Sequence, residues 1–260
     1  AMPHRERCGS PARARRRSGR VAARTVRGPG PQRPWLPELP TRIDLAELRA
    51  LAVGTDPGAL LLGLIDEPEQ QRQTVRVLGD RGLCVVGAAG SGRTTALATV
   101  AAQAPGCVWV PGDPEGAWDA LAGVEDEAWP DQDGAPGRHA AIRTLVIDDL
   151  DALLAAYPLD YAQAVADRVE RIVRGAGARG IRVVVSAQRL AGAAARIAEL
   201  LPRRAILATA SRLEHVAAGG DPRTRREGAP PGRADLDGHE LQFAWAPPPE
   251  PRAVAVPPFA

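Results

Sequence analysis

A glycine-rich turn between a short apolar run and a helix-forming run constrains this chain more than any other feature. The stretch reads GLCVVGAAGSGRTTAL, and its centre, Gly87 to Thr94, has the spacing of the phosphate-binding pattern GxxxxGK[ST] with arginine in the lysine position. Glycines let backbone N–H groups wrap a phosphate in conformations that a Cβ atom would obstruct. The helix that follows adds its N-terminal partial positive charge. The pattern predicts a phosphate-binding loop.

The loop offers both backbone and side-chain contacts to a nucleotide. Thr94 would place its hydroxyl on a magnesium ion that bridges the outer phosphates, and Thr95 would lie toward the α-phosphate. The alternative is a tight strand-to-helix connection without a ligand. We expect the nucleotide-binding residues to be Gly87, Gly90, Ser91, Gly92, Arg93, Thr94 and Thr95.

Arginine at position 93 changes what this loop can do. It keeps the positive charge, but its planar fork is bulkier than an ammonium group and cannot take over its compact contacts. All 33 basic residues of the chain are arginine, so a general drift away from lysine is an alternative explanation for Arg93. We expect ATP binding to persist and hydrolysis to suffer.

A second motif supplies carboxylates. The run TLVIDDLDAL places Asp148 and Asp149 at the carboxyl end of an apolar strand, where parallel sheets present their ligands. Asp148 would hold magnesium, and Asp149 takes the place of the glutamate that usually polarises the attacking water. Its side chain is one methylene shorter, which predicts slow turnover. The alternative is that these carboxylates cap the next helix.

A third strand, in RGIRVVVSAQRL, ends on polar residues. Ser186, Gln188 and Arg189 could sense the γ-phosphate, and Gln188 joins Asp148 and Asp149 as a predicted catalytic residue. A plain strand terminus is the alternative. The four histidines and three cysteines lack metal-ligand spacing, and no order of residues suggests a nucleophilic triad.

Short, nearly continuous apolar runs alternate with segments of helical periodicity, which predicts an α/β fold with a parallel sheet. Before them, Asp44 would cap a short helix that runs to Leu51, and two strands would flank a turn at Asp66–Pro68. The alternating strands are expected at 83–86, 107–110, 144–147, 181–186 and 205–208. The helices are expected at 94–103, 115–122, 161–174 and 191–201.

Composition divides the chain into four parts. Residues 1–34 hold ten arginines against Glu6, a balance of +9, so the rest carries −7 of the total of +2. We expect 1–34 to be a disordered tail, in which Arg13–Arg20 is either a solvated linker or a patch for nucleic acid or anionic lipid. Segment 35–80 would pack on the ATPase body of 81–250, and 251–260 would be a second tail. Residues 126–138 read as a surface loop.

Three stretches carry a resemblance to a known family. GIRVVVSAQR, VIDD and PPGRADLDGHELQFA resemble FtsK/SpoIIIE-type ATPase domains, whereas Arg93 and Asp149 depart from that pattern. WLPELPTRIDL and LLLGLIDEPEQQRQ are similar to what precedes the tandem ATPase domains of EccC, the motor of actinobacterial type VII secretion. The resemblance covers roughly Trp35 to Trp245.

The resemblance implies a RecA-like P-loop fold with a mostly parallel central sheet flanked by helices, and ATP and Mg²⁺ as ligands. It implies neighbouring ATPase domains of the same chain, a homo-hexameric ring and secreted WXG-motif proteins as partners. It also implies a cytoplasmic domain of a membrane-anchored complex, with membrane contact through other parts of the protein. In such rings an arginine completes the neighbour's site, and the positions to consider are Arg203, Arg204 and Arg212.

Three functions are compatible with these sequence features. The first is a weakly hydrolysing or regulatory nucleotide-binding module of the secretion motor, which fits the glycine loop with altered catalytic residues. The second is a fully active ATPase that drives protein export. The third is a DNA translocase, which the acidic balance of residues 35–260 disfavours because it offers no basic stripe for a phosphate backbone.

Overall fold

The computed structural model describes residues 36–128 and 144–247. The predicted tails 1–34 and 251–260 lie outside the described residues, as does most of the predicted loop 126–138. What is described of that loop differs from the expectation, because residues 126–128 form the last turn of a helix. No helix of the described ranges is long and apolar enough to cross a membrane.

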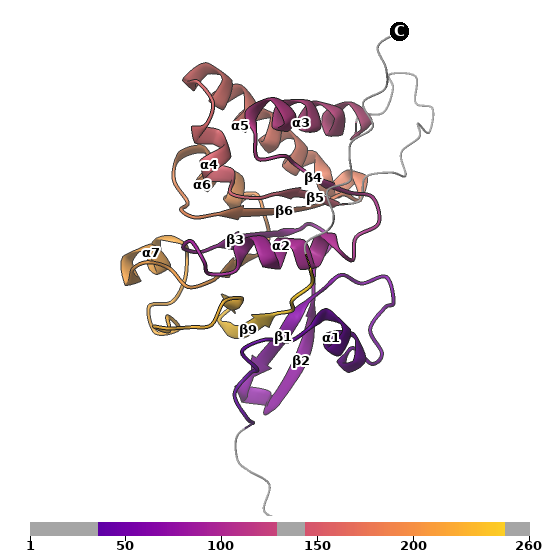
Figure 1. The fold of residues 1–260 in the computed structure, drawn as a ribbon, viewed down its shortest axis with the longest axis vertical. Coiled ribbons are helices and arrows are strands. Elements are labelled where there is room, and N and C mark those ends of the chain that lie inside the picture. The colour runs from indigo at the N-terminus through magenta and orange to yellow at the C-terminus, as the bar shows by residue number, and fades with distance from the viewer. Residues whose placement is uncertain (1–35, 129–143, 248–260) are drawn as a thin grey trace, which may run out of the picture. The chain divides into compact units, whose positions relative to one another are not determined.

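One sheet runs through the described residues, in the order β2-β1-β9-β8-β7-β3-β6-β5-β4 (Figure 1). Its strands are β1 (Leu61–Glu67), β2 (Arg72–Val77), β3 (Leu83–Val86), β4 (Cys107–Trp109), β5 (Thr144–Ile147), β6 (Arg182–Ala187), β7 (Arg204–Ile206), β8 (Arg233–Leu236) and β9 (His239–Phe243).

The sheet has a parallel half and an antiparallel half. Strands β4, β5, β6, β3 and β7 pair in parallel, which confirms the α/β class and the five parallel strands expected from the sequence, although β4 is only partly buried. Strands β8, β9, β1 and β2 pair antiparallel. After β3 the chain continues to β4 at one edge and later returns to β7 on the other side of β3, so β3 is the point where the winding reverses. In open α/β sheets ligands bind at such a point.

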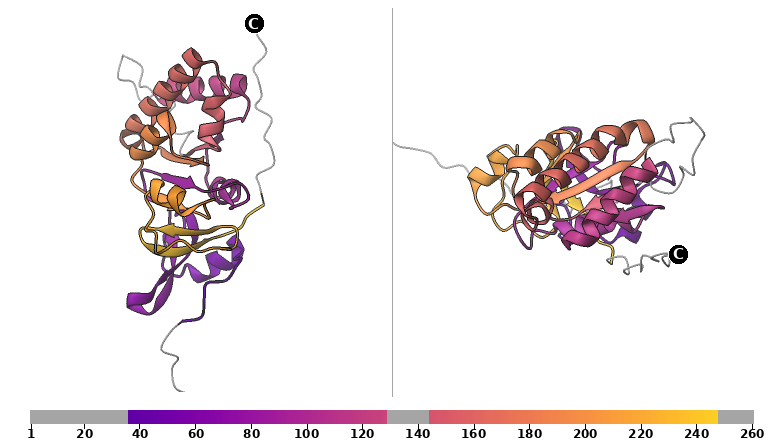
Figure 2. Two further views of the ribbon diagram at one scale, coloured as in Figure 1. Left: turned by 90° about the vertical axis from the view of Figure 1, so that its left-hand side faces the viewer. Right: turned by 90° about the horizontal axis from the view of Figure 1, so that it is seen from above.

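Helices cover this sheet. They are α1 (Leu45–Leu51), α2 (Arg93–Ala101), α3 (Pro114–Ala128), α4 (Leu150–Ala155), α5 (Leu159–Ala176), α6 (Gly192–Glu199) and α7 (Arg212–Ala217), with the 3₁₀ turns η1 (Pro68–Gln70) and η2 (Gly177–Arg179). Figures 1 and 2 show α3, α4, α5 and α6 grouped together beside β5 and β6.

Strand β3 shows how the two faces of the sheet divide the core. Cys84 and Val86 pack with the helices α3 to α6, whereas Leu83 and Val85 pack with α2. All four side chains are buried, as expected for a parallel strand covered on both faces. Burial raises the pKa of the Cys84 thiol to about 12, so it is an inert core group.

The leading segment packs on the antiparallel half. Asp44 precedes α1 as expected, and its N–H donates to the Glu47 carboxylate. The two predicted strands form the β1–β2 hairpin, whose turn ends at Gln71 in a left-handed conformation. Helix α7 and strands β8 and β9 were not predicted from the sequence, and α4 was considered only as a helix that the carboxylates would cap.

Candidate nucleotide-binding site

The predicted phosphate loop lies between β3 and α2, at the strand where the winding of the sheet reverses. Gly90 and Gly92 have φ of +76° and +101°, and Gly92 is the residue before the first turn of α2. A Cβ atom on Gly92 would lie 2.6 Å from the backbone nitrogen of Gly232. That same N–H donates to the Ser91 carbonyl at 2.8 Å. Both torsion and space therefore require glycine at position 92.

Part of the loop backbone is satisfied and part is free. The Gly87 N–H donates to Ala187 at 3.2 Å, the Ala88 N–H to Ala208 at 2.8 Å, and the Ser91 N–H to the Ala88 carbonyl at 3.1 Å. Five further N–H groups have no hydrogen-bond acceptor among the described residues, namely those of Ala89, Gly90, Gly92, Arg93 and Thr94. Free backbone donors at a helix N-terminus are suited to an anion.

The Arg93 side chain turns back onto its own loop. Its Nη1 donates to the Gly87 carbonyl at 2.6 Å, and its Nη2 lies 2.5 Å from Asp149 Oδ1. The side chain is 8% exposed. The sequence predicts that this guanidinium attracts a triphosphate, whereas in the structure it pairs with Asp149, the residue predicted to polarise water.

Asp149 stands before α4 with φ of +47°, a left-handed conformation that is uncommon for aspartate. Its N–H donates to Ser186 Oγ at 2.9 Å and to Asp148 Oδ1 at 3.1 Å. Burial raises the pKa of the Asp149 carboxyl, the Arg93 charge lowers it, and the charges of Asp148 and Asp151 raise it again. The result is a carboxyl group with a raised pKa, held by its backbone and directed to Arg93.

Asp148 is anchored from the neighbouring strand. Strand β6 lies between β3 and β5, and its Ser186 is fully buried. The Ser186 hydroxyl donates to Asp148 Oδ1 at 2.5 Å. Ser186, considered in the sequence as a γ-phosphate sensor, thus contacts the acidic strand and fixes its first aspartate. Asp148 Oδ2 has no hydrogen bond among the described residues.

Gln188 and Asp151 complete this edge of the sheet. The Asp151 carboxylate accepts the N–H groups of Gln188 at 2.9 Å and of Arg189 at 3.1 Å. The Gln188 side chain is exposed and has no partner in the described ranges. Asp151 was not among the predicted site residues, although the third aspartate of IDDLD was a signal for it. Its role is to hold the backbone after β6.

The donor set of the loop fits a polyphosphate with magnesium. Thr94 is exposed and its hydroxyl has no partner within the described residues, and Thr95 is partly buried. Asp148 keeps one free oxygen, so a hydroxyl and a carboxylate are available for a hard cation. The described part of the chain contains no group of three acidic, histidine or cysteine side chains that could hold a metal alone. Phosphate oxygens would have to supply the other ligands.

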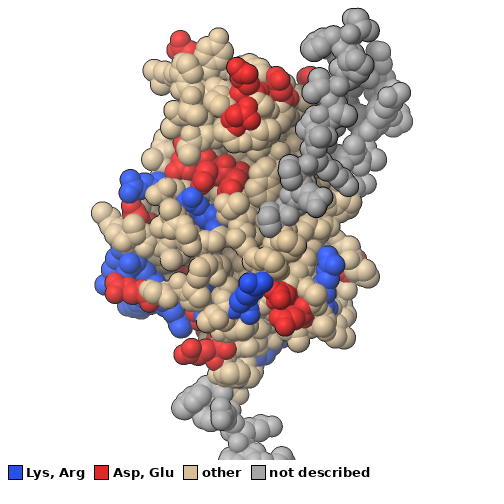
Figure 3. All heavy atoms as spheres, in the orientation of Figure 1, with Lys and Arg blue, Asp and Glu red and all other residues tan. Residues whose placement is uncertain are grey.

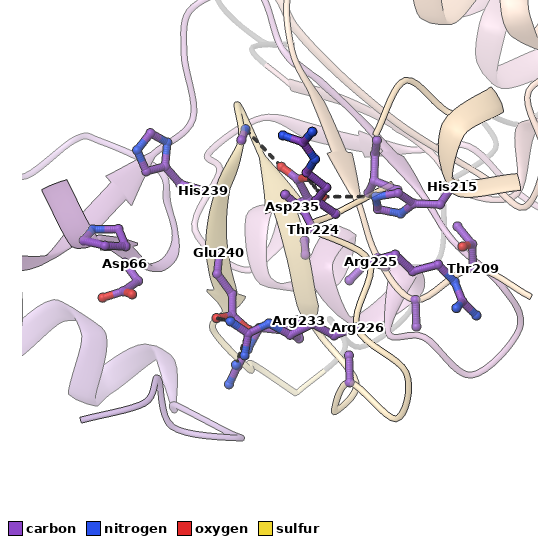
Figure 4. A pocket seen from close by; sticks show the side chains of 18 of the residues that line it. Asp66, Thr209, His215, Thr224, Arg225, Arg226, Arg233, Asp235, His239 and Glu240 are labelled. Carbon is purple, nitrogen blue, oxygen red and sulfur yellow. Dashed lines mark hydrogen bonds and ion pairs between the residues drawn. The ribbon is translucent and has the colours of Figure 1, made fainter. Parts of the chain in front are cut away.

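A pocket of about 260 Å³ lies beside this site. Figure 4 shows it between the β1–β2 hairpin, α7, the loop of residues 223–226 and strands β8 and β9. It borders the phosphate loop at Ala208, whose carbonyl accepts the Ala88 N–H, yet no residue of that loop or of the acidic strand lines it.

The polar side chains of this pocket largely satisfy one another. His215 lies 3.2 Å from Thr224 Oγ1, and the Thr224 hydroxyl donates to Asp235 (Figure 4). Glu240 accepts Arg233 Nη1 at 2.7 Å and also pairs with Arg226 at 3.1 Å. These bonds hold β8, β9 and their preceding loop together, and the pocket needs no ligand to satisfy these groups.

The arginines considered for a neighbouring subunit's site differ in their freedom. Arg203 pairs with Asp237 at 3.3 Å. Arg204 pairs with Glu199 at 2.7 Å and donates to the Ala218 carbonyl at 2.9 Å. Arg212, on α7, is exposed and has no partner among the described residues. Of the three positions, Arg212 is therefore the one whose guanidinium is available to another chain.

Charges of both signs share the surface near α7 and β9. On the face that Figure 3 shows, arginine and acidic side chains lie beside one another in the region of α7 and β9. Arg189 pairs with Glu214 at 2.9 Å and Arg226 with Glu240 at 3.1 Å in this region. This face carries no continuous basic stripe of the kind that tracks a nucleic-acid backbone.

No protein-family model and no curated protein sequence matches the chain. Solved structures do. The cytoplasmic domain of the type VII secretion ATPase EccC of Thermomonospora curvata matches with a TM-score of 0.63 and 22% identity, over 81% of this chain and 32% of that one. ATPases 2 and 3 of the same protein, in complex with a signal sequence peptide, match with a TM-score of 0.59 and 20% identity, over 81% and 49%.

ATPases 2 and 3 of EssC from Geobacillus thermodenitrificans match with a TM-score of 0.53 and 16% identity, over 81% of this chain and 48% of that one. The chain thus spans half or less of the length of these three structures. At such identities the likeness shows the fold alone, and the chain has the fold of the EccC and EssC ATPase domains. The α/β fold expected from the sequence is confirmed, whereas the sheet, expected to be mostly parallel, is parallel only from β7 to β4.

Proposed function

We propose that this chain is a nucleotide-binding ATPase module of a type VII secretion motor, with weak or regulatory rather than fast hydrolysis. The observation that carries the proposal is the set of five free N–H groups on a glycine loop at the reversal point of the sheet, those of Ala89, Gly90, Gly92, Arg93 and Thr94. Such donors bind phosphate through the backbone, so they do not depend on the missing lysine.

The residues of this chain would divide the work as follows. The loop amides would bind the phosphates, while Thr94 and Asp148 would hold magnesium, which neutralises phosphate charge. Ser186 keeps Asp148 in place by its hydrogen bond of 2.5 Å. Gln188 lies on a backbone that Asp151 fixes, with its side chain free to reach a ligand.

Two features support weak hydrolysis. Arg93 is paired with Asp149, so the loop cation and the carboxylate expected to activate water are directed at each other. Asp149 is also shorter than the glutamate of the family pattern, and small misplacements of catalytic groups are costly in rate. A fully active motor would need both side chains to rearrange.

The wider role is proposed from the likeness to the EccC and EssC structures. Neighbouring ATPase domains, a hexameric ring and a secreted WXG-motif protein as cargo are the partners that such a motor requires. One matching EccC structure holds a signal sequence peptide, which supports a peptide partner for the assembly. The exposed Arg212 is the position we propose for contact with a neighbouring domain.

Calorimetric titration with ATP and Mg²⁺, combined with a phosphate-release assay, tests the proposal. We expect ATP to bind with a dissociation constant below about 1 mM. We expect turnover below about 0.1 s⁻¹, against about 10 s⁻¹ for a typical enzyme. Asp148→Ala should remove the contribution of magnesium to affinity, whereas Asp119→Asn, on the exposed side of α3, should change nothing.

The outcomes separate the alternatives. Absence of ATP binding in the presence of Mg²⁺ would reject the nucleotide assignment. Turnover near 10 s⁻¹ that Asp148→Ala abolishes would instead identify a fully active export motor.

A further inference from the structure

One guanidinium ties together the ends of two strands that are not neighbours. Arg93 begins α2 and contacts Gly87, at the start of its own loop, through Nη1. Through Nη2 it reaches Asp149, which follows β5. Because β6 lies between β3 and β5, this side chain spans the end of β6. The loop and the acidic strand are therefore connected by a side chain and not by a ligand.

Arg93 and Asp149 differ in how much free energy each would lose if their ion pair broke. The Arg93 side chain is 8% exposed and the Asp149 side chain 43% exposed. Because the Asp149 carboxylate is already partly exposed, it would be hydrated after it leaves Arg93, and its release would cost little free energy. A released Arg93 guanidinium would stay within the loop, where a buried charge requires a new counter-ion. A phosphate oxygen on the free loop amides would be that counter-ion.

The geometry of the Arg93–Asp149 ion pair would allow another anion to replace the carboxylate. Nη2 and Oδ1 are 2.5 Å apart, but Oδ1 receives no aligned hydrogen bond, so charge more than direction holds the pair. Phosphate and carboxylate are both matched by the guanidinium fork. The backbone of Asp149 is fixed by Ser186 and Asp148, so the carboxylate is presented to Arg93 whenever no other anion is bound.

We propose that Arg93 and Asp149 form a latch across the phosphate loop, and that a nucleotide binds by exchanging the Asp149 carboxylate for a phosphate oxygen on the guanidinium. This inference rests on the proposed function and deepens it. Asp149 is then a competitor of phosphate for Arg93, a role different from the activation of water. The latch sets the nucleotide affinity of the module and keeps its loop closed when nucleotide is scarce.

A binding cycle tests the exchange. Asp149→Asn keeps the shape of the side chain and removes its charge, so it should tighten ATP binding by about 5- to 10-fold in calorimetry. In the Arg93→Met background the same change should alter affinity by less than about twofold, because no guanidinium remains to be released. Asp119→Asn, which removes one exposed carboxylate on α3, is the matched charge control.

Simple repulsion between Asp149 and the nucleotide makes a different prediction. It would tighten ATP binding on Asp149→Asn equally with and without Arg93, and that result would overturn the latch. Weaker binding by Asp149→Asn would overturn it as well. Binding without dependence on Arg93 would reject the latch alone, whereas no binding by any of the variants would reject the proposed function together with it.

A second cycle needs no nucleotide. Urea unfolding of the wild-type protein, the two single variants and the double variant measures whether positions 93 and 149 interact in the free protein. We expect the changes in the unfolding constants to be non-additive by about 3- to 10-fold. Additive changes would show that the pair does not hold the loop, and would overturn the latch even if the variants fold with altered stability.

Discussion

The phosphate loop and the acidic strand meet at the same edge of the sheet, but they differ in how many of their polar groups already have a partner within the protein. In the loop, the N–H groups from Ala89 to Thr94 are mostly unengaged. On the acidic strand, Asp148 is bonded to Ser186, Asp149 to Arg93, and Asp151 to the backbone after β6. The loop backbone is mostly open, whereas each of the three carboxylates contacts another part of the protein, and Asp148 keeps one oxygen free.

This difference shows which part of such a site withstands sequence change. Backbone donors depend only on glycine torsions and on the start of a helix, so replacement of one side chain leaves them in place. Catalysis depends on side chains placed to within a fraction of an ångström. Under the proposed function, a loop with arginine for lysine keeps its phosphate-binding donors while hydrolysis slows.

The largest effect is expected where the loop backbone itself is disturbed. Gly92→Ala should lower the free energy of unfolding by about 3 kcal/mol and abolish ATP binding, because a Cβ would lie 2.6 Å from Gly232 N at a φ of +101°. Gly90→Ala is the matched control. It also has a positive φ, +76°, but nothing lies within 4 Å of its Cβ, so we expect a loss of about 1 kcal/mol in urea unfolding.

Equal costs for the two glycine variants would contradict the close approach of Gly232. Retained ATP binding by Gly92→Ala would break the comparison more deeply, because it would mean that the backbone of this loop does not carry the affinity.

A smaller effect is expected from the anchor of the acidic strand. Ser186→Ala removes the hydroxyl that bonds Asp148 and accepts the Asp149 N–H, so it should cost about 2 kcal/mol in urea unfolding. Ser91→Ala is the matched change in the loop. The Ser91 hydroxyl is buried without a partner among the described residues, so its removal should change stability by less than about 0.5 kcal/mol.

The comparison between the two serines fails if Ser91→Ala is the more harmful change. That result would mean that the loop hydroxyl has a partner in solution, and that the loop is less open than its free N–H groups indicate.

The smallest effect on stability is expected at Gln188. Its side chain is exposed, so Gln188→Ala should change the free energy of unfolding by less than about 0.5 kcal/mol in chemical denaturation. Any residual ATP turnover should fall, because Gln188 is the free polar side chain nearest in sequence to the end of β6. Unchanged turnover would remove it from the proposed catalytic residues.

The parts of the molecule that the sequence predicted are those encoded locally. The glycine loop follows from torsions that single residues require, and the five parallel strands from short apolar runs. The pairing of Arg93 with Asp149 was not predicted, because it joins residues that follow two strands separated by β6 and depends on where two side chains turn. The sequence placed both residues in the site but could not decide what each of them contacts.

Three of the four missed elements, β8, β9 and α7, did carry local signals. Asp237 and Gly238 both have positive φ and connect β8 to β9, and Asp-Gly between apolar runs is a strong hairpin signal. Ser211 caps α7 through the Glu214 N–H at 3.1 Å, and Ser-x-x-Glu is a known start of a helix. Helix α4 entered the sequence interpretation only through the alternative that the carboxylates cap a helix. Asp149 does precede α4, but its side chain makes no capping hydrogen bond.

The close approach of Gly232 to the phosphate loop has a consequence for biosynthesis. The Ser91 carbonyl accepts the Gly232 N–H, and the Thr99 hydroxyl donates to the Ala244 carbonyl at 2.6 Å. A ribosome completes the loop and α2 well over a hundred residues before it adds these partners, and contacts so distant along the chain form late. The nascent protein therefore lacks these two contacts to its glycine turn and to α2 until translation has passed β9.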